Sequence, residues 1–176
     1  MPRHITRRYF GWQAYPPLAL VTTLLFGLLS TSALATSALA DKPVVAINSL
    51  IDGLHKDAAA ARFENYFERY TDDAVFLGTD KTERWTIDQF KAYARPVFDT
   101  GRGWSYTVIE RHVEGDSDLR WFDEILFNEK LGHCRGTGVV KKTQTGWRVA
   151  HYSLTLLIPN SVAATIGEQS KIADAK

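Results

Sequence analysis

The sequence predicts an α+β fold in which a curved, cone-shaped antiparallel sheet is covered by three N-terminal helices. Two observations carry this prediction: apolar residues recur at helical spacing up to residue 98, and they alternate as in strands from residue 104 on. Short turns join the strand-like segments, which is typical of an antiparallel meander. One face of such a sheet is apolar and must be buried against other elements. Helices on that face would leave a conical pocket between the two layers.

The elements can be placed in order along the chain. Residues 44–54 and 57–70 each carry a helical apolar stripe and predict an αα-hairpin, followed by a short strand over residues 74–77. Thr86 and Gln89 form a capping-box pattern that opens a third helix, which we expect Pro96 to kink or end. Four longer strands are expected over residues 104–113, 119–127, 133–142 and 147–158. Residues 161–176 are expected to be a weakly structured tail, frayed or marginally helical.

Residues 1–40 are predicted to be a signal peptide. They contain three arginines and no acidic residue, then an apolar run over residues 18–29, and they end in Ala38-Leu39-Ala40. This order is typical of export signals, and the competing interpretation, a retained anchor, needs an apolar run of about 20 residues. We therefore expect cleavage after Ala40 and a periplasmic or secreted protein that meets a membrane only through its export signal. The pair Arg7-Arg8, followed by Tyr9-Phe10, resembles the twin-arginine signal and leaves both export routes open.

The part of the chain after residue 40 is near neutral and has one cysteine. The whole chain carries 21 Lys and Arg against 20 Asp and Glu, so removing the three leader arginines leaves 18 basic and 20 acidic side chains. This balance argues against nucleic acid as a partner, because a nucleic-acid surface needs an excess of positive charge. Cys134 alone cannot close an internal disulfide, and the histidines lack zinc-site spacing, so neither a metal nor a cofactor is predicted.

Several segments carry a resemblance to a known family. Tyr70 to Phe76, before the capped helix, and Trp147 to Ser153 are similar to the opening and closing segments of the nuclear transport factor 2-like superfamily. Arg84-Trp85-Thr86, Trp121 to Glu124 and Gly136 to Val139 resemble segments of its SnoaL-like domains. The resemblance implies a SnoaL-like domain over residues 41–160 and a homodimer formed through the open sheet face. Because the superfamily includes isomerases, dehydratases and cyclases as well as binding domains, the resemblance implies no single activity.

Asp123 is the first candidate for a catalytic residue. Alternation in the strand over residues 119–127 places it on an almost wholly apolar face, which we expect to point inward. A carboxyl group in such a setting has a raised pKa and can act as a general acid or base, or a buried partner can hold it for structure alone. Tyr152 is expected to face the pocket, with His151 on the reverse surface, and either Tyr152 or Arg135 is expected to polarise a substrate oxygen. Glu124 is expected on the outer face, paired with a basic residue of a neighbouring strand.

Aromatic side chains are the candidates for ligand binding, since an apolar pocket with few polar groups suits a small apolar molecule. The residues expected to line the pocket are Tyr66, Trp85, Trp104, Tyr106, Trp121 and Arg135. Arg135 could hold an anionic group or pair with a nearby glutamate.

Two hypotheses about function follow from these candidates. The favoured one is an exported module that binds a small apolar ligand and dimerises through its sheet. The alternative is a cofactor-free pocket enzyme of the isomerase, cyclase or dehydratase type that uses Asp123 as general acid or base.

Overall fold

The computed structural model describes residues 25–175, with side chains from residue 42 on. The chain divides after Ala40 into two units, and the description below concerns the second. The signal peptide predicted over residues 1–40 therefore falls largely outside the described residues. No described helix has the length and hydrophobicity that a membrane crossing requires.

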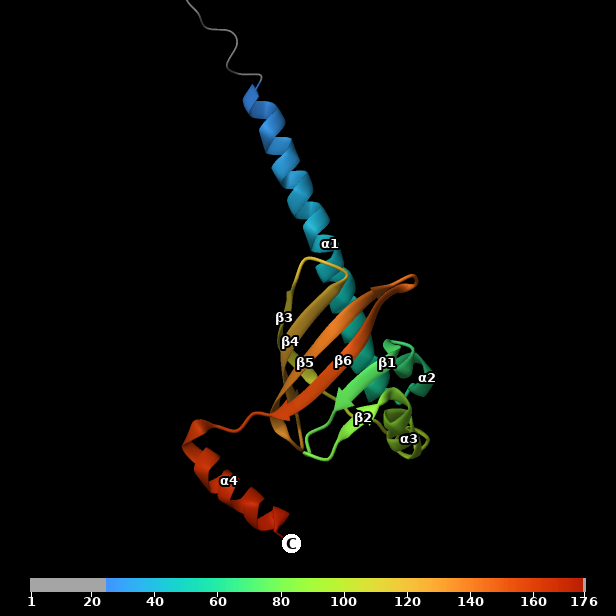
Figure 1. The fold of residues 1–176 in the computed structure, drawn as a ribbon, viewed down its shortest axis with the longest axis vertical. Helices are drawn as coiled ribbons and strands as arrows, with labels where there is room; N and C mark the ends of the chain where they lie inside the picture. The colour runs from blue at the N-terminus through green and yellow to red at the C-terminus, as the bar shows by residue number, and fades with distance from the viewer. Residues whose placement is uncertain (1–24, 176) are drawn as a thin grey trace, which may run out of the picture. The chain divides into compact units, whose positions relative to one another are not determined.

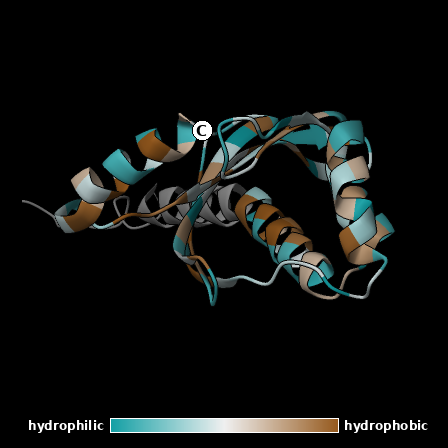
Figure 2. Cartoon of the chain, turned by 90° about the horizontal axis from the view of Figure 1, so that it is seen from below, coloured by the Kyte–Doolittle hydropathy of each residue, from teal (hydrophilic) through white to brown (hydrophobic). Residues whose placement is uncertain are grey.

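A six-stranded sheet forms the body of the second unit (Figure 1), with the strand order β2-β1-β6-β5-β4-β3. The strands are β1 (Tyr70–Leu77), β2 (Arg84–Thr86), β3 (Thr107–Glu114), β4 (Leu119–Asn128), β5 (Gly132–Thr143) and β6 (Gly146–Leu156). From β3 to β6 they form an antiparallel meander, while β1 joins β6 in parallel and pairs with β2 at the edge. The sheet is curved and unclosed (Figure 2), which confirms the predicted α+β fold class.

The described residues form four helices: α1 (Leu25–Ala59), α2 (Phe63–Phe67), α3 (Ile87–Phe98) and α4 (Asn160–Asp174). From residue 42 on, α1 lies in the concave side of the sheet (Figure 2), where Ile47, Ile51 and Leu54 are buried. These residues share one face because they recur at three- and four-residue spacing, as the sequence predicts. In contrast, α4 buries no residue, so the segment predicted as a weak tail is helical but exposed.

The capped third helix is present as predicted. The backbone N–H of Thr86 donates to Gln89 Oε1 at 2.9 Å, and the backbone N–H of Gln89 donates to Thr86 Oγ1 at 3.4 Å. Pro96 lies inside α3, which ends two residues later at Phe98. Because proline lacks a backbone N–H and disturbs the preceding turn, an end this close to it is expected.

The predicted boundary between the first two helices is wrong. Asp57 does not begin a second helix: α1 continues to Ala59, and α2 is a short helix of five residues. Asp57 is instead a buried carboxylate in the last turn of α1, where it accepts hydrogen bonds from Arg62 Nε and Arg69 Nε, both at 2.7 Å. Two guanidinium groups thus compensate the burial of this charge and fix the chain reversal after α1.

The inward face predicted for β4 is also wrong. The buried residues of this strand are Arg120, Phe122, Glu124 and Leu126. Asp123 lies on the outer face, and Trp121 beside it is 56 % exposed. The outer face is itself apolar, because Ile109 and Leu119 are also more than half exposed. The inner face accepts a charge because partners surround Glu124. The number of apolar residues on each face of β4 therefore predicted the wrong face as the buried one.

A β-bulge in β6 sets the direction of the side chains near the site. Val139 pairs with His151 but Val140 pairs with Val149, so β6 carries one extra residue, Ala150. A bulge shifts the alternation by one residue, and both Val149 and Tyr152 are therefore buried. His151 falls on the outer face. Strict alternation counted back from Tyr152 would place Val149 on the outer face, and the bulge turns it inward. Tyr152 itself lies inside, where the sequence places it.

Candidate functional site

A cavity of about 190 Å³ lies between the concave face of the sheet and the helices. Eight of the residues that line it are aromatic: Tyr66, Phe76, Trp85, Phe90, Tyr93, Trp104, Tyr106 and Tyr152. A concave, mainly apolar lining with a few polar groups is typical of small-molecule sites. An engineered apolar cavity of about 150 Å³ in another protein takes up benzene, so a ligand of one or two rings matches the available volume.

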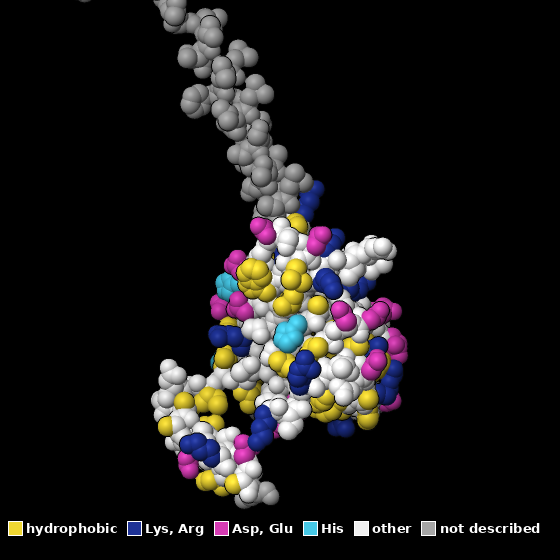
Figure 3. All heavy atoms as spheres, in the orientation of Figure 1, with side chains coloured by type: hydrophobic (Ala, Val, Ile, Leu, Met, Phe, Trp, Pro, Cys, Tyr) yellow, Lys and Arg dark blue, Asp and Glu magenta, His cyan; other side chains and the backbone are white. Residues whose placement is uncertain are grey.

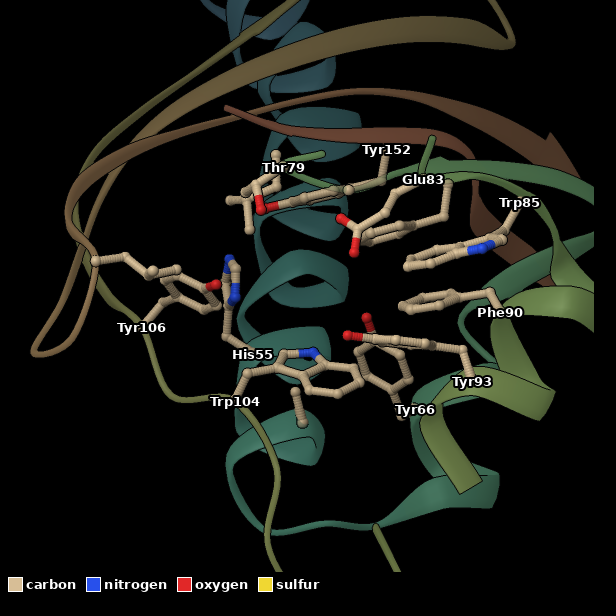
Figure 4. A pocket seen from close by; sticks show the side chains of 15 residues that line it. His55, Tyr66, Thr79, Glu83, Trp85, Phe90, Tyr93, Trp104, Tyr106 and Tyr152 are labelled. Carbon is tan, nitrogen blue, oxygen red and sulfur yellow. The ribbon is translucent and has the colours of Figure 1, made fainter. Parts of the chain in front are cut away.

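Stacked rings form one wall of the cavity (Figure 4). The ring of Trp85 lies 5.7 Å from that of Phe90 and 4.4 Å from that of Tyr93, and the ring of Phe76 stacks on Phe90 at 3.9 Å and lies 6.1 Å from Trp85. The local sequence explains the wall. Phe90 and Tyr93 are three residues apart on α3 and share a face, while Trp85 directly precedes the capping residue.

A buried carboxylate, Glu124, lies behind the aromatic lining. Its side chain is fully buried and accepts three short hydrogen bonds. His55 Nε2 lies 2.8 Å from Oε1, Tyr152 donates its hydroxyl to the same oxygen at 2.9 Å, and Arg111 Nε donates to Oε2 at 2.8 Å. His55 comes from α1, Arg111 from β3 and Tyr152 from β6, so this network, which we call the Glu124 network, joins the helix to the sheet.

His55 and Arg111 together set the charge of the network, and Arg111 also links it to α1. The Arg111 side chain is only 6 % exposed, and its Nη1 also donates to Asp52 on α1 at 2.7 Å. Burial alone would raise the pKa of Glu124, but the hydrogen bonds and charges of His55 and Arg111 outweigh it and hold this pKa below its ordinary value. Glu124 is therefore ionised at neutral pH. Burial and the neighbouring carboxylate raise the pKa of Tyr152 well above its ordinary value, so its hydroxyl keeps its proton.

The ionised state of Glu124 sets the tautomer of His55. A carboxylate only accepts hydrogen bonds, so Nε2 of His55 must carry the proton that it donates. In the neutral imidazole this leaves Nδ1 as an acceptor, on a side chain that lines the cavity. A histidine held in one tautomer by a buried carboxylate can take up a proton, because the carboxylate stabilises the imidazolium that forms.

Gly136 makes room for this arrangement. It pairs with Glu124 across the β4–β5 ladder, and a Cβ at this position would collide with the Tyr152 hydroxyl and lie 2.9 Å from Glu124 Oε1. The glycine thus permits the close approach of Tyr152 to the carboxylate. The small residues of β5 have a specific packing role at this point.

A second carboxylate, Glu83, lies at the rim of the cavity. Its oxygens point into the space between the rings (Figure 4), and Oε2 accepts a hydrogen bond from the backbone N–H of Asp80 at 3.1 Å. Thr79 and Gly78 of the same loop also contribute to the lining. His55 and Glu83 are thus the titratable groups other than tyrosine that the cavity presents to a ligand.

The structure brings together five of the predicted site residues and separates the other three. The five that line the cavity are Tyr66, Trp85, Trp104, Tyr106 and Tyr152. Asp123, Trp121 and Arg135 belong to the outer face of the sheet and do not reach the cavity. For Asp123 and Trp121 the reason is the reversed orientation of β4. Arg135 pairs with Ile125 of that strand and shares its outward direction.

Sequence reasoning missed the Glu124 network and Glu83. A usable signal existed for His55, which lies four residues after the buried Ile51 and thus on the inward face of its helix. Arg111 reaches Glu124 because β3 pairs with β4, and no pattern within either segment predicts which residues become partners. Within the described residues no cluster of three or more His, Cys, Asp or Glu is arranged to hold a metal ion.

Three solved structures resemble this chain. A nuclear transport factor 2-like protein of unknown function from Pseudomonas putida is 14% identical, with a TM-score of 0.56 over 72% of this chain and 92% of that one. A domain of unknown function with a cystatin-like fold from Nostoc punctiforme is 15% identical, with a TM-score of 0.58 over 74% and 92%. A ketosteroid isomerase-like protein from Erwinia carotovora atroseptica is 20% identical, with a TM-score of 0.53 over 68% and 99%.

At these identities the likeness establishes the fold and leaves the activity open. No curated protein sequence matches the chain. The family comparison is more specific, since the SnoaL-like domain matches residues 47–159, which include the Glu124 network and the aromatic wall. The chain therefore belongs to the SnoaL-like domain family and has the nuclear transport factor 2-like fold.

Proposed function

We propose that the cavity binds a largely apolar molecule of one or two rings and that His55 transfers a proton to or from it. One observation carries the proposal: His55 lines the cavity while its Nε2 lies 2.8 Å from the buried, ionised Glu124. A histidine that is both accessible to a ligand and backed by a carboxylate is arranged as a general base.

Each group of the network has a role in this proposal. Nδ1 of His55 removes a proton from a carbon or oxygen of the ligand, and Glu124 stabilises the imidazolium through its bond to Nε2. Arg111 keeps Glu124 ionised, and the Tyr152 hydroxyl holds the orientation of the carboxylate. The proton can then return to another atom of the ligand or to a leaving group. Isomerisation and dehydration both fit this sequence of events, and a general base contributes about 10²–10⁴-fold to such rates.

A binding module without turnover is the second candidate. Its support is that eight aromatic rings line the cavity, whereas a single histidine carries the proposed chemistry. In that case the Glu124 network would serve only to join α1 to the sheet. The two candidates differ in what happens when His55 is replaced by a residue that keeps the hydrogen bond but cannot take up a proton.

The test compares the full chain with a His55→Gln variant. The Gln amide can donate to Glu124, so the variant should fold and bind. One-ring ketones that bind are incubated in D₂O, and deuterium uptake at carbon is followed by NMR. We expect exchange to slow by about 100-fold or more in His55→Gln and to be unchanged in His133→Gln, a control at an exposed position. Exchange at the wild-type rate in His55→Gln, or no exchange with a ketone that binds, would favour the binding module.

We also propose that the chain forms a homodimer through the outer face of its sheet. Hydrophobic side chains gather on this face (Figure 3), and Ile109, Leu119 and Trp121 are each more than half exposed. Exposed apolar surface of this kind is typical of interfaces. Light scattering should give twice the monomer mass for the wild type and the monomer mass for Trp121→Glu, and a wild-type monomer would refute the proposal.

Export with cleavage after Ala40 is a further proposal, supported by the basic start, the apolar run and the small-residue ending of residues 1–40. Expression of the full chain in a Gram-negative host, followed by fractionation and N-terminal sequencing, tests it. The expected product begins at Asp41 outside the cytoplasm. A product that retains residues 1–40 in the membrane would instead indicate an anchor.

A further inference from the structure

Among the described residues that line the cavity, one side chain is acidic, and none is a lysine or an arginine. Glu83 lies among the aromatic rings at the rim, and its carboxylate points into the cavity (Figure 4). The chain has 21 lysines and arginines, yet none from the described part of the chain lines the cavity. Among the described residues, no lysine or arginine nitrogen lies within 4.0 Å of the Glu83 oxygens. Within the part of the chain whose side chains are described, this carboxylate therefore has no lysine or arginine partner.

The loop before β2 holds Glu83 in this direction. Gly78 N donates to the backbone oxygen of Glu83 at 2.8 Å, and Asp80 N donates to its Oε2 at 3.1 Å. A Cβ at Gly78 would collide with the Glu83 carboxylate, so the glycine lets the loop fold onto the side chain. Asp80 is in turn fixed by the Thr82 backbone N–H and hydroxyl at 2.8 and 2.6 Å. The loop thus uses Oε2 for a hydrogen bond of its own, while the Glu83 side chain as a whole lines the cavity.

The rings around Glu83 add to the same preference. The faces of aromatic rings carry partial negative charge and attract cations, most strongly for tryptophan. Trp85 and Trp104 both line the cavity, with Tyr93 between them at ring distances of 4.4 and 6.5 Å. An anionic ligand would meet the Glu83 carboxylate and these ring faces, and no lysine or arginine of the described residues lines the cavity to bind it. The negative charge of Glu83 and the partial negative charge of the ring faces therefore disfavour the binding of an anion in this cavity.

We propose that the ligand of this cavity is a small organic cation: an aromatic or alkyl amine in its ammonium form, with the nitrogen at Glu83 and the apolar part among the rings. The inference rests on the proposed binding site but not on the proton transfer assigned to His55. The Glu124 network, whose own charge is balanced by Arg111, lies at the inner end of the same cavity.

Three ligands of matched shape test the charge preference: 2-phenylethylammonium, 2-phenylethanol and 3-phenylpropanoate. Their binding to the full chain is measured by calorimetry or ligand-observed NMR at constant ionic strength. We expect the ammonium ion to bind about tenfold more tightly than the alcohol, and the carboxylate to bind most weakly. Glu83→Gln should remove the advantage, so that the ammonium ion binds no more tightly than the alcohol does to the same variant. Glu129→Gln, an exposed substitution outside the cavity lining, is the matched control and should keep the advantage.

Two results would overturn the inference. The first is a lack of preference: the alcohol or the carboxylate binds as tightly as the ammonium ion, or the ammonium ion does not bind at all. The other is a preference for the ammonium ion that survives in Glu83→Gln. Neither result bears on proton transfer, because that proposal fails only if His55→Gln keeps the wild-type exchange rate or if a bound ketone shows no exchange. The two proposals can therefore fail separately.

Discussion

Replacing Glu124 by Gln should destabilise the protein by about 3 kcal/mol at neutral pH. The substitution keeps the size of the side chain, so it opens no void, but it removes a buried charge that accepts three hydrogen bonds. The amide can offer its oxygen to Arg111 or to the His55–Tyr152 pair, but not to both. Breaking a buried ion pair from one side costs about 3–5 kcal/mol. We expect the lower end, because Arg111 retains its 2.7 Å contact with Asp52.

The pH dependence of this loss has a definite sign. The pKa of Glu124 is lower in the folded protein than its ordinary value of 4.5, so the carboxylate stabilises the fold above pH 4.5. That contribution is lost as the pH falls through the folded-state pKa. The difference in unfolding free energy between wild type and Glu124→Gln should therefore shrink as the pH falls below 4.5 and through the folded-state pKa of Glu124.

Urea denaturation followed by fluorescence measures the effect. With a slope of about 2 kcal/mol/M, a loss of 3 kcal/mol lowers the transition midpoint by about 1.5 M. Glu110→Gln is the matched control on the neighbouring strand. This side chain is exposed, so its substitution should change the stability by less than about 0.5 kcal/mol. A loss below about 1 kcal/mol for Glu124→Gln, or a difference that does not shrink in acid, would refute the reasoning.

Substitutions at three further positions probe the neighbourhood of the site. Gly136→Ala should cost about 1–3 kcal/mol in urea unfolding, because its Cβ would collide with the Tyr152 hydroxyl; an unchanged midpoint would contradict the packing argument. Thr86→Ala should lower the unfolding free energy by about 1 kcal/mol through loss of the helix cap, and Thr86→Ser should restore most of it. Burial raises the pKa of Tyr106 to about 12, so ultraviolet titrations of wild type and Tyr106→Phe should diverge only above about pH 11; divergence near pH 10 would contradict the burial.

Much of the fold could be predicted from the sequence because its local signals agree with its global arrangement. The capping box at Thr86 and Gln89 and the alternation in β4 and β5 are properties of short segments, and the structure keeps them. The edge strand β2 was missed, since three residues are too few to show alternation. The end of α1 was misplaced because Asp57 is a good capping residue by type, and only contacts with Arg62 and Arg69 show its actual use.

The candidate site was predicted less well, and the reason is physical. Aromatic residues such as Tyr66 and Trp104 were assigned to the pocket because large apolar side chains gather where helices meet a sheet. The direction of β4 was wrong because hydrophobicity decides which face is buried only where the outer face is polar. Trp121 on the outer face removed that contrast, and the partners that allow Glu124 to be buried lie on α1, β3 and β6.

The error at β4 is itself informative about function. A sequence whose apolar residues point outward and whose carboxylate points inward departs from the simplest way to build a stable sheet. Burying Glu124 requires Arg111, His55 and Tyr152 on three other elements, together with a glycine at position 136. Replacing a buried ionic group by well-packed apolar residues is often neutral or stabilising, so stability alone is a weak reason for this arrangement. The proposed proton transfer gives the network a reason beyond stability: it fixes the orientation of His55, so that its imidazole lines the aromatic cavity while Nε2 stays bonded to Glu124.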